Sequence, residues 1–487
     1  MPVTHLTDFS DRLSPMLVKE LRQGMRARSF TMLFLIFQLL LAFILLTAGS
    51  AADPEDSGGI ASGVIFTMFT IAVLFVQPMR GLTALSGEIG GNTIEMMVLT
   101  RLSASRIVLG KWIAIVSQSA LILITIIPYL ILRYFYGGMI LFGEMVFLTL
   151  IFLTSMALTA VMVGLSGTTT KLIRVLPILG FIFMIQMVPM FLFRSGFNGF
   201  MSICTMSTWE SRLGIFSYIC FIAYVGWCAL SYGTSVIAPI AENHSTIRRV
   251  VALTLACITA AIGLHDSINP QFLPLVFGII LAPAVLTALT EPSILLPPIC
   301  KPFLKRGAAG RIASLFLLPG WPAGVFYTML LVTISVVGVV LSHKPTSSPI
   351  DDVAAIVCLA FTGGILLPAL LASNFTKQES KRFTNFIIFL LASVILTIIP
   401  AIFANMNHHE KYLWLFVWNP PVLLTMVDDH SFAKSSLLKA GLIVDAIYLV
   451  LLLITAAIAF RGYGRIFKEA EDELAAGVKP VSPQPEP

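Results

Sequence analysis

The residues most able to do chemistry are charged side chains placed inside apolar segments. Asp445 lies in the run LLKAGLIVDAIYLVLLLI, about 9 Å along a helix from Lys439. A carboxylate within a membrane helix can bind a proton or a polar substrate. It can equally face a polar neighbour or lipid headgroups, so both interpretations stay open.

Metal-ligating residue types occur in two short groups, HHE at 408–410 and DDH at 428–430. Imidazole and carboxylate groups suit zinc or copper, but this spacing matches no metal motif, so we expect no metal. The six cysteines are scattered, mostly in apolar runs, without a C-x-x-C pair. They are expected to be small core residues, not ligands or disulfides.

A nucleotide site is not expected in this chain. The Gly110-Lys111 pair is followed by Trp112, and Ser105 stands where a Walker A loop needs its first glycine. We find no other phosphate-binding glycine loop, and no cluster of residues suited to catalysis. The sequence therefore predicts a non-enzymatic chain without a cofactor of its own.

The elements that position these residues are apolar helices. With 57% hydrophobic residues, 11% charged residues and a mean hydropathy of +0.92, the chain needs lipid as its solvent. We predict an all-α polytopic membrane protein of about twelve transmembrane helices. Their apolar runs are 29–49, 60–78, 112–133, 145–168, 175–193, 213–239, 250–265, 271–290, 318–341, 353–373, 384–403 and 437–460.

Charge predicts the orientation of these spans. With the N-terminus in the cytoplasm, all but seven of the 31 Lys and Arg residues fall in cytoplasmic loops or tails. Both termini are then cytoplasmic, in a multi-pass protein of the cell (cytoplasmic or inner) membrane. The same bias explains the net charge of +6 without a nucleic-acid partner.

The runs divide the chain into two possible halves. Residues 1–28 form a cytoplasmic N-terminus, 29–245 and 246–460 each hold six runs, and 461–487 form a cytoplasmic tail with a disordered end. LTALSGE at 82–88 and LTALTEP at 286–292 each follow the second run of a half. This similarity suggests an internal duplication, although short strings of this kind also recur by chance.

Two segments and a set of glutamines are expected to depart from simple membrane spans. Ser14 can cap an amphipathic helix that starts at Pro15, and this elbow helix should lie on the inner leaflet. The segment 412–427, broken by Pro420 and Pro421, is expected to be re-entrant or superficial. Glutamines within spans are expected to bond between helices or to line a path, namely Gln38, Gln118 and Gln186.

The loop 79–111 contains the most informative local pattern. Gly90-Gly91 should end the preceding element, and Asn92 can cap a short helix with Glu95 at its third position. A short, half-apolar helix on the cytoplasmic side can be a docking element. The alternative is a loop helix that rests on the protein's own inner face.

The elbow helix and the loop together contain a set of residues in a fixed order: Pro15, Lys19, Glu20, Leu21 and Arg22 in the elbow, then Glu88, Gly91, Asn92, Thr93, Ile94, Glu95, Leu99, Thr100, Leu102, Ser103, Arg106, Ile107, Leu109, Gly110 and Lys111. In this order the loop resembles the segment between spans two and three in permease subunits of ATP-binding-cassette (ABC) transporters of the type-2 exporter class, and the elbow resembles the helix before their first span. Arg101 departs from that pattern, since proline is usual there, and six further spans exceed the common six-span core.

The resemblance implies that this loop is a coupling helix for a separate cytoplasmic ATPase, which would bind ATP and Mg²⁺. The chain would be a transport permease, acting with a second copy or a second permease if its own second half has diverged. Two other classes stay open. An ion-coupled secondary transporter would use charged or broken helices, and a membrane enzyme acting on lipids or glycans would need clustered polar groups at one face.

Overall fold

The computed structural model describes most of the helical part of the chain. Within it every regular element is a helix, and the chain divides into two compact units, Met1–Ala238 and Pro239–Pro487, which are considered separately. The described residues are 15–49, 54–91, 103–134, 141–168, 202–239, 241–265, 273–343, 350–376, 378–407, 414, 417–426 and 436–475.

Ten helices in these ranges are long and apolar enough to cross a membrane. Of the twelve predicted runs, 175–193 lies outside the described residues, and 384–403 lies in helix α19 (Arg382–Asn407), whose described part is a shorter apolar helix. The short run at 250–265 is the end of a 19-residue helix. The described part of the chain is thus all-helical, and its long apolar helices are those of a multi-pass membrane protein.

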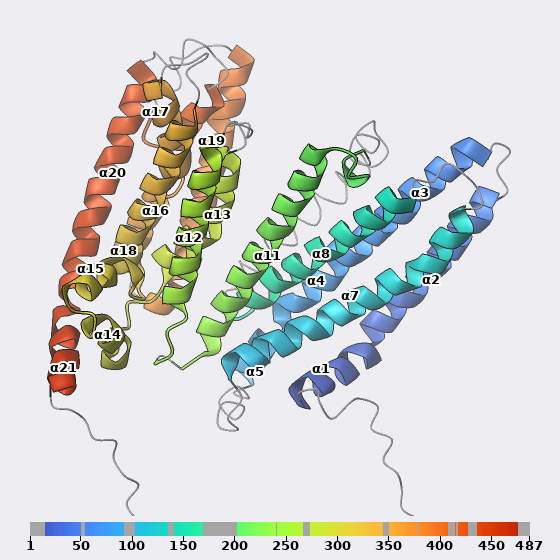
Figure 1. Cartoon of the computed structure of the whole chain (residues 1–487), viewed down its shortest axis with the longest axis horizontal. Coiled ribbons are helices and arrows are strands. Elements are labelled where there is room, and N and C mark those ends of the chain that lie inside the picture. Colours follow the sequence, from blue (N-terminus) through green and yellow to red (C-terminus); the bar gives the residue numbers. More distant parts are fainter. Residues whose placement is uncertain are drawn as a thin grey trace, which may run out of the picture. The chain divides into compact units, whose positions relative to one another are not determined.

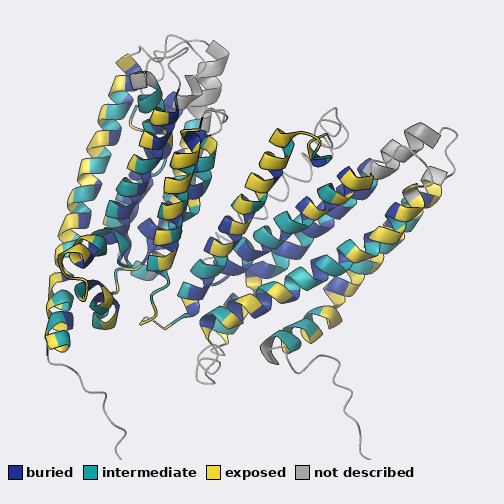
Figure 2. Ribbon diagram, in the orientation of Figure 1, coloured by how far each residue is buried: buried dark blue, intermediate teal, exposed yellow. Residues whose placement is uncertain are grey.

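The exposure of large apolar side chains indicates that lipid surrounds these helices. Large apolar side chains such as Leu39 and Leu46 on one helix, and Ile447 and Ile454 on another, are exposed. Figure 2 shows exposed positions along the length of several helices, interspersed with buried and intermediate ones. Apolar surface of this extent is stable only against hydrocarbon or another protein.

In its described residues the first unit contains the amphipathic N-terminal helix and five long helical segments (Figure 1). Helix α1 covers Pro15–Arg26, the described part of the predicted elbow helix, whereas the predicted cap Ser14 lies outside the described residues. Its elements are α1 (Pro15–Arg26), α2 (Arg28–Gly49), α3 (Pro54–Ile71), η1 (Ala72–Val76), α4 (Gln77–Met79), η2 (Arg80–Thr83), α5 (Ser86–Gly90), α7 (Ala104–Tyr134), α8 (Leu141–Leu165) and α11 (Trp209–Ile237).

The second long segment continues well past its predicted end at residue 78. A π-helical turn, η1, precedes Pro78, and helical turns then follow to Gly90. Proline has no N–H with which to complete the π turn, and the hydroxyl of Ser155 instead donates to the carbonyl of Val73 at 2.6 Å. Of the predicted loop 79–111, the described residues 79–90 are therefore mostly in helical turns, and Ala104 to Lys111 belong to the next long helix.

Close backbone approach joins α8 to α11. A Cβ on Gly164 would lie 2.2 Å from the carbonyl oxygen of Ala229, and one on Gly233 would lie 2.8 Å from the Cα of Gly164. Small residues at such crossings let membrane helices pack tightly. Gln38 donates to Thr125 at 2.8 Å, which joins α2 to α7, as predicted for glutamines within spans.

The second unit also consists of helices alone in its described part (Figure 1). Its elements are α12 (Ser245–Gly263), α13 (Leu273–Thr290), α14 (Pro297–Leu304), α15 (Gly307–Leu317), α16 (Trp321–Ser342), α17 (Ile350–Thr362), α18 (Leu366–Phe375), η4 (Glu379–Lys381), α19 (Arg382–Asn407), η6 (Pro420–Met426), α20 (Ser436–Arg461) and α21 (Gly464–Ala475). Helix α16 packs against α12, α13, α17 and α20, and so forms the centre of this unit.

The segment broken by Pro420 and Pro421 forms a short 3-10 helix, η6, in its described part. It packs against α17, α19 and α20, and Val422 and Leu423 are fully buried. The amide of Asn419 donates to the carbonyl of Ser393 at 3.1 Å, which ties the start of η6 to α19. The described residues 420–426 are therefore packed between helices and are too short to form a span.

Candidate functional site

Three residues from the predicted elbow helix and coupling loop meet at one point in the first unit. The ammonium of Lys111 lies 3.0 Å from a carboxylate oxygen of Glu20 and 3.1 Å from one of Glu88. The Lys111 side chain is 7% exposed, and each carboxylate side chain is 17% exposed. A single cation thus neutralises two partly buried anions.

This triad joins three separate elements. Glu20 lies in α1, Glu88 in α5 at the end of the second long segment, and Lys111 in the second turn of α7. Helix α1 also packs against α7, where a Cβ on Gly24 would meet the amide nitrogen of Gln118 at 2.3 Å. The elbow helix is therefore fixed to the base of the predicted coupling loop.

A second polar group lies beside this contact. The guanidinium of Arg80 donates to the side-chain oxygens of Gln118 and Gln77, and it lies over the ring of Phe30, 5.7 Å from its centre. Phe30 is at the start of α2. Arg80 thus connects the first, second and third long segments.

The C-terminal half of the predicted coupling loop is anchored in the structure. Ser103 accepts hydrogen bonds from the amides of Arg106 and Ile107 through its carbonyl and so begins α7. Ile107 is fully buried and packs with Leu85, whereas Arg106 is exposed. Gly110 is buried one residue before Lys111.

The remaining predicted coupling residues lie outside the described residues; they are Asn92, Thr93, Ile94, Glu95, Leu99, Thr100 and Leu102. In the elbow helix, Lys19 and Arg22 are exposed and Leu21 is half-buried. Pro15 begins this helix. The structure therefore brings Glu20, Glu88 and Lys111 together and fixes the two ends of the loop.

The second unit contains a buried ion cluster that the sequence analysis missed. Glu291 follows α13 directly and accepts from Arg248 and from Arg249, each at 2.7 Å. All three side chains are less than a tenth exposed. Burial raises the pKa of the Glu291 carboxyl, but the charges of Arg249 and Arg248, with hydrogen bonds from Ser245 and Arg248, hold that pKa below its ordinary value.

Arg249 also organises the start of α16. Its guanidinium donates to the carbonyls of Phe316, Leu318 and Gly320, while the amide of Gly320 donates to Glu291 at 3.2 Å. Gly320 has φ +105°, a conformation that favours glycine, and it caps α16. The sequence signal that could have revealed this cluster is the pair of adjacent arginines at a helix start together with the glutamate directly after an apolar run.

The two units use ions at corresponding places. In the second unit, Arg248 and Arg249 at the start of α12 contact Glu291 after α13 directly, whereas in the first unit Glu20 of the elbow and Glu88 at the end of the second segment are joined only through Lys111. In the first unit Lys111 adds the start of the third long helix, and in the second unit Gly320 does so. This shared arrangement favours the duplication hypothesis, which stays a prediction.

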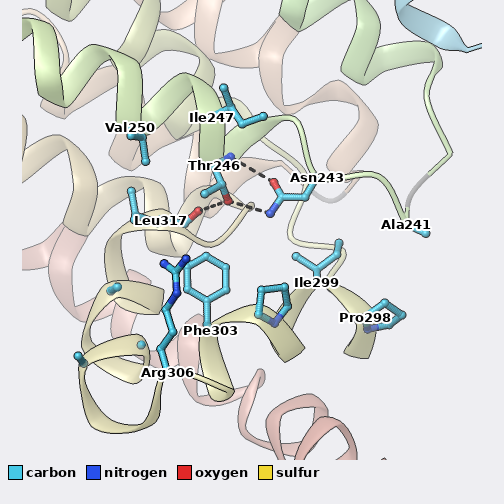
Figure 3. A pocket seen from close by; sticks show the side chains of 14 residues that line it. Ala241, Asn243, Thr246, Ile247, Val250, Pro298, Ile299, Phe303, Arg306 and Leu317 are labelled. Atoms are coloured by element: carbon cyan, nitrogen blue, oxygen red, sulfur yellow. Dashed lines mark hydrogen bonds between the residues drawn. The ribbon is translucent and has the colours of Figure 1, made fainter. Parts of the chain in front are cut away.

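An apolar groove of about 600 Å³ lies between the start of α12 and helices α14 and α15. Figure 3 shows Ile299, Phe303 and Val250 in its lining. At one end Asn243 donates to Thr246 at 2.7 Å, and Thr246 donates to the carbonyl of Leu317 at 2.8 Å. Arg306 brings a positive charge to this mostly apolar surface.

Asp445 is buried in α20, where the hydroxyl of Thr362 donates to its Oδ2. One of the two carboxylate oxygens thus has a polar neighbour, which is one of the two interpretations that the sequence left open. Among the described residues no group of three His, Cys, Asp or Glu side chains could hold a metal, and the groups at 408–410 and 428–430 lie outside them.

Comparisons with protein-family models, with curated proteins and with solved structures gave no match. The fold alone defines a multi-pass, all-helical membrane protein. Any finer class depends on the residues and contacts described above.

Proposed function

We propose that this chain is the membrane-spanning permease subunit of an ABC transporter of the type-2 exporter class, driven by a separate cytoplasmic ATPase. The observation that carries the proposal is the Lys111 triad. It fixes an amphipathic N-terminal helix to the base of the loop whose sequence resembles a coupling helix.

The triad gives this loop a mechanical connection. A force on the loop between Gly90 and Ala104 acts directly on the ends of the second and third long segments. Through Glu20 it also acts on the elbow helix. A partner that moves the loop would therefore shift three elements together, as a transporter driven from outside its membrane domain requires.

The orientation follows from the positive-inside bias, which we take to place both termini and the triad in the cytoplasm of a cell membrane. ATP and Mg²⁺ would then be bound by the partner. The second unit would be either a diverged repeat or a distinct helical domain, and a second permease chain completes the transporter in the latter case.

One observation favours the second candidate, an ion-coupled secondary transporter. Asp445 is a buried carboxylate beside a break between two short helices, α17 and α18. Charged groups at broken helices are typical of such transporters. Substrate flux that needs no ATPase would favour this candidate.

The proposal is tested by co-purification of the tagged protein in mild detergent, with identification of partners and an ATP hydrolysis assay. We expect a nucleotide-binding subunit with the wild type and its loss when Ile94, Glu95 and Leu99 are changed to alanine. A matched control changes Ile312 and Glu469, which are exposed on α15 and α21, to alanine. No ATPase in any sample would overturn the proposal.

A further inference from the structure

The predicted apolar run 353–373 of the second unit is divided into two helices. Helix α17 ends at Thr362, a turn covers residues 363–365, and α18 starts at Leu366. Gly363 makes the turn possible, because a Cβ there would lie 2.7 Å from the carbonyl of Leu359 and 3.3 Å from Pro420 of η6. The break is thus covered by η6 and not by solvent.

Helix α20 presents a matching face to this break. Gly441 lets α20 approach closely, since a Cβ there would meet Leu423 of η6 at 2.3 Å. Asp445 follows one turn later on the same face. One turn of α17 faces it, and the Thr362 hydroxyl lies within hydrogen-bond distance of both Asp445 Oδ2 and the carbonyl oxygen of Cys358, so that its single proton is donated to one of them at a time.

The Asp445 carboxyl is only half satisfied. It is 5% exposed, its Oδ2 accepts from Thr362, and its Oδ1 has no hydrogen-bond partner among the described residues. A carboxylate with one neutral donor in an apolar site carries a large desolvation penalty. A proton removes that charge and needs no cavity, whereas a metal cation or an organic ligand would need space.

No described cation approaches to neutralise Asp445. Among the residues that the structure describes, Cys358 on α17 and Tyr448 on α20 are the ionisable groups near it, and the Tyr448 hydroxyl donates to the carbonyl of Trp418 at 2.8 Å. The elements α16, α18 and η6, which pack against α20, carry no Asp, Glu, His, Lys or Arg. Lys439 is exposed on another face of α20, and the acidic residues of α17 are at its start, about three turns from Thr362.

We propose that Asp445 is a proton-binding site of the second unit and that its proton stabilises the packing of α20 against the break between α17 and α18. Loss of the proton leaves a charge in this apolar contact, which favours separation of the two elements or entry of water. Thr362 positions the carboxyl and lowers the cost of the charged form through its hydroxyl. The site is independent of the loop that the proposed ATPase would bind.

The first test uses dicyclohexylcarbodiimide on the full-length protein in detergent, with modified residues identified by mass spectrometry. A protonated carboxyl adds across a C=N bond of the reagent, its proton passes to the nitrogen, and the adduct rearranges to a stable N-acylurea. We expect Asp445 to be modified at neutral pH. Labelling should fall about tenfold for each pH unit once the group is mostly ionised.

Glu291 is the internal control, because it is equally buried but ionised by two arginines and so should stay unmodified. Choline chloride and sodium chloride are compared at constant pH. Labelling that is independent of the salt supports a proton site. Protection by sodium would assign a cation site and overturn the proposal, as would the absence of labelling at every pH.

A second variant separates proton binding from a structural role. Thr362→Val keeps the shape of the side chain but removes its donor, so it should move the midpoint of labelling upward by about one pH unit or more. Asp445→Asn should abolish labelling at this position while the protein stays monodisperse. An unchanged midpoint in Thr362→Val would overturn the proposed geometry.

Discussion

The Lys111 triad allows a specific prediction about stability. Lys111→Met removes the cation and leaves the carboxylates of Glu20 and Glu88 partly buried beside each other. Removal of one partner from a buried ion pair costs about 3–5 kcal/mol, and the 17% exposure of each carboxylate favours the lower end of that range. We therefore expect a loss of about 3 kcal/mol in the unfolding free energy of the first unit.

Thermal unfolding of the purified protein, followed by tryptophan fluorescence, measures this loss. For a unit of this size each kcal/mol lowers Tm by about 2–4 °C, so Lys111→Met should lower it by about 6–12 °C. Lys305→Met is the matched control, since Lys305 is exposed and should leave Tm within about 1–2 °C of the wild type.

A second comparison, between the stability of Lys111→Met and that of a triple variant, tests the same reasoning. Adding Glu20→Gln and Glu88→Gln to Lys111→Met removes the uncompensated charges, so the triple variant should be more stable than Lys111→Met alone. The reasoning would be refuted by a Lys111→Met protein that melts like the wild type, or by a triple variant less stable than the single one.

Three further predictions concern other contacts. Glu291→Gln should destabilise the second unit by about 3 kcal/mol or more at neutral pH. The folded pKa is lowered, so this difference is present above the ordinary pKa of about 4.3 and shrinks as pH falls through the lowered value; thermal melts at several pH values check it. Gly164→Ala forces α8 from α11 and should cost about 1–3 kcal/mol, while Gly214→Ala, with open space at its Cβ, should be neutral or stabilising in the same melts. Burial raises the pKa of Cys204 and of Cys300 to about 11, so both should react with N-ethylmaleimide at neutral pH only after denaturation in SDS; reaction in the folded protein would contradict their burial.

The long helices could be predicted from the sequence because a span needs a continuous apolar run, and this signal is local. The elbow helix was predicted from another local signal, a capping serine followed by a proline, and α1 covers Pro15–Arg26. The extension of the second segment beyond Pro78 was not predicted, since proline normally ends a helix. It depends on the hydroxyl of Ser155, which comes from a helix far away in the chain.

Which charged residues form ion pairs with one another could not be predicted in the same way. Glu20, Glu88 and Lys111 were each selected by resemblance, but their contact joins residues 91 and 23 positions apart. Arg248 and Arg249 were assigned only to membrane orientation, because a positive charge near a span end has that role in any topology. Their pairing with Glu291 depends on how the helices of the second unit pack.

The central claim, that the loop between Gly90 and Ala104 docks on an ATPase, is tested most directly by a photo-crosslinking amino acid in place of Ile94 in intact membranes. The proposed permease predicts an ultraviolet-dependent crosslink to a separate protein that contains a Walker A sequence, and its loss in the presence of Glu95→Ala and Leu99→Ala. Crosslinks confined to this chain itself would show a loop helix resting on its own inner face and would contradict the claim.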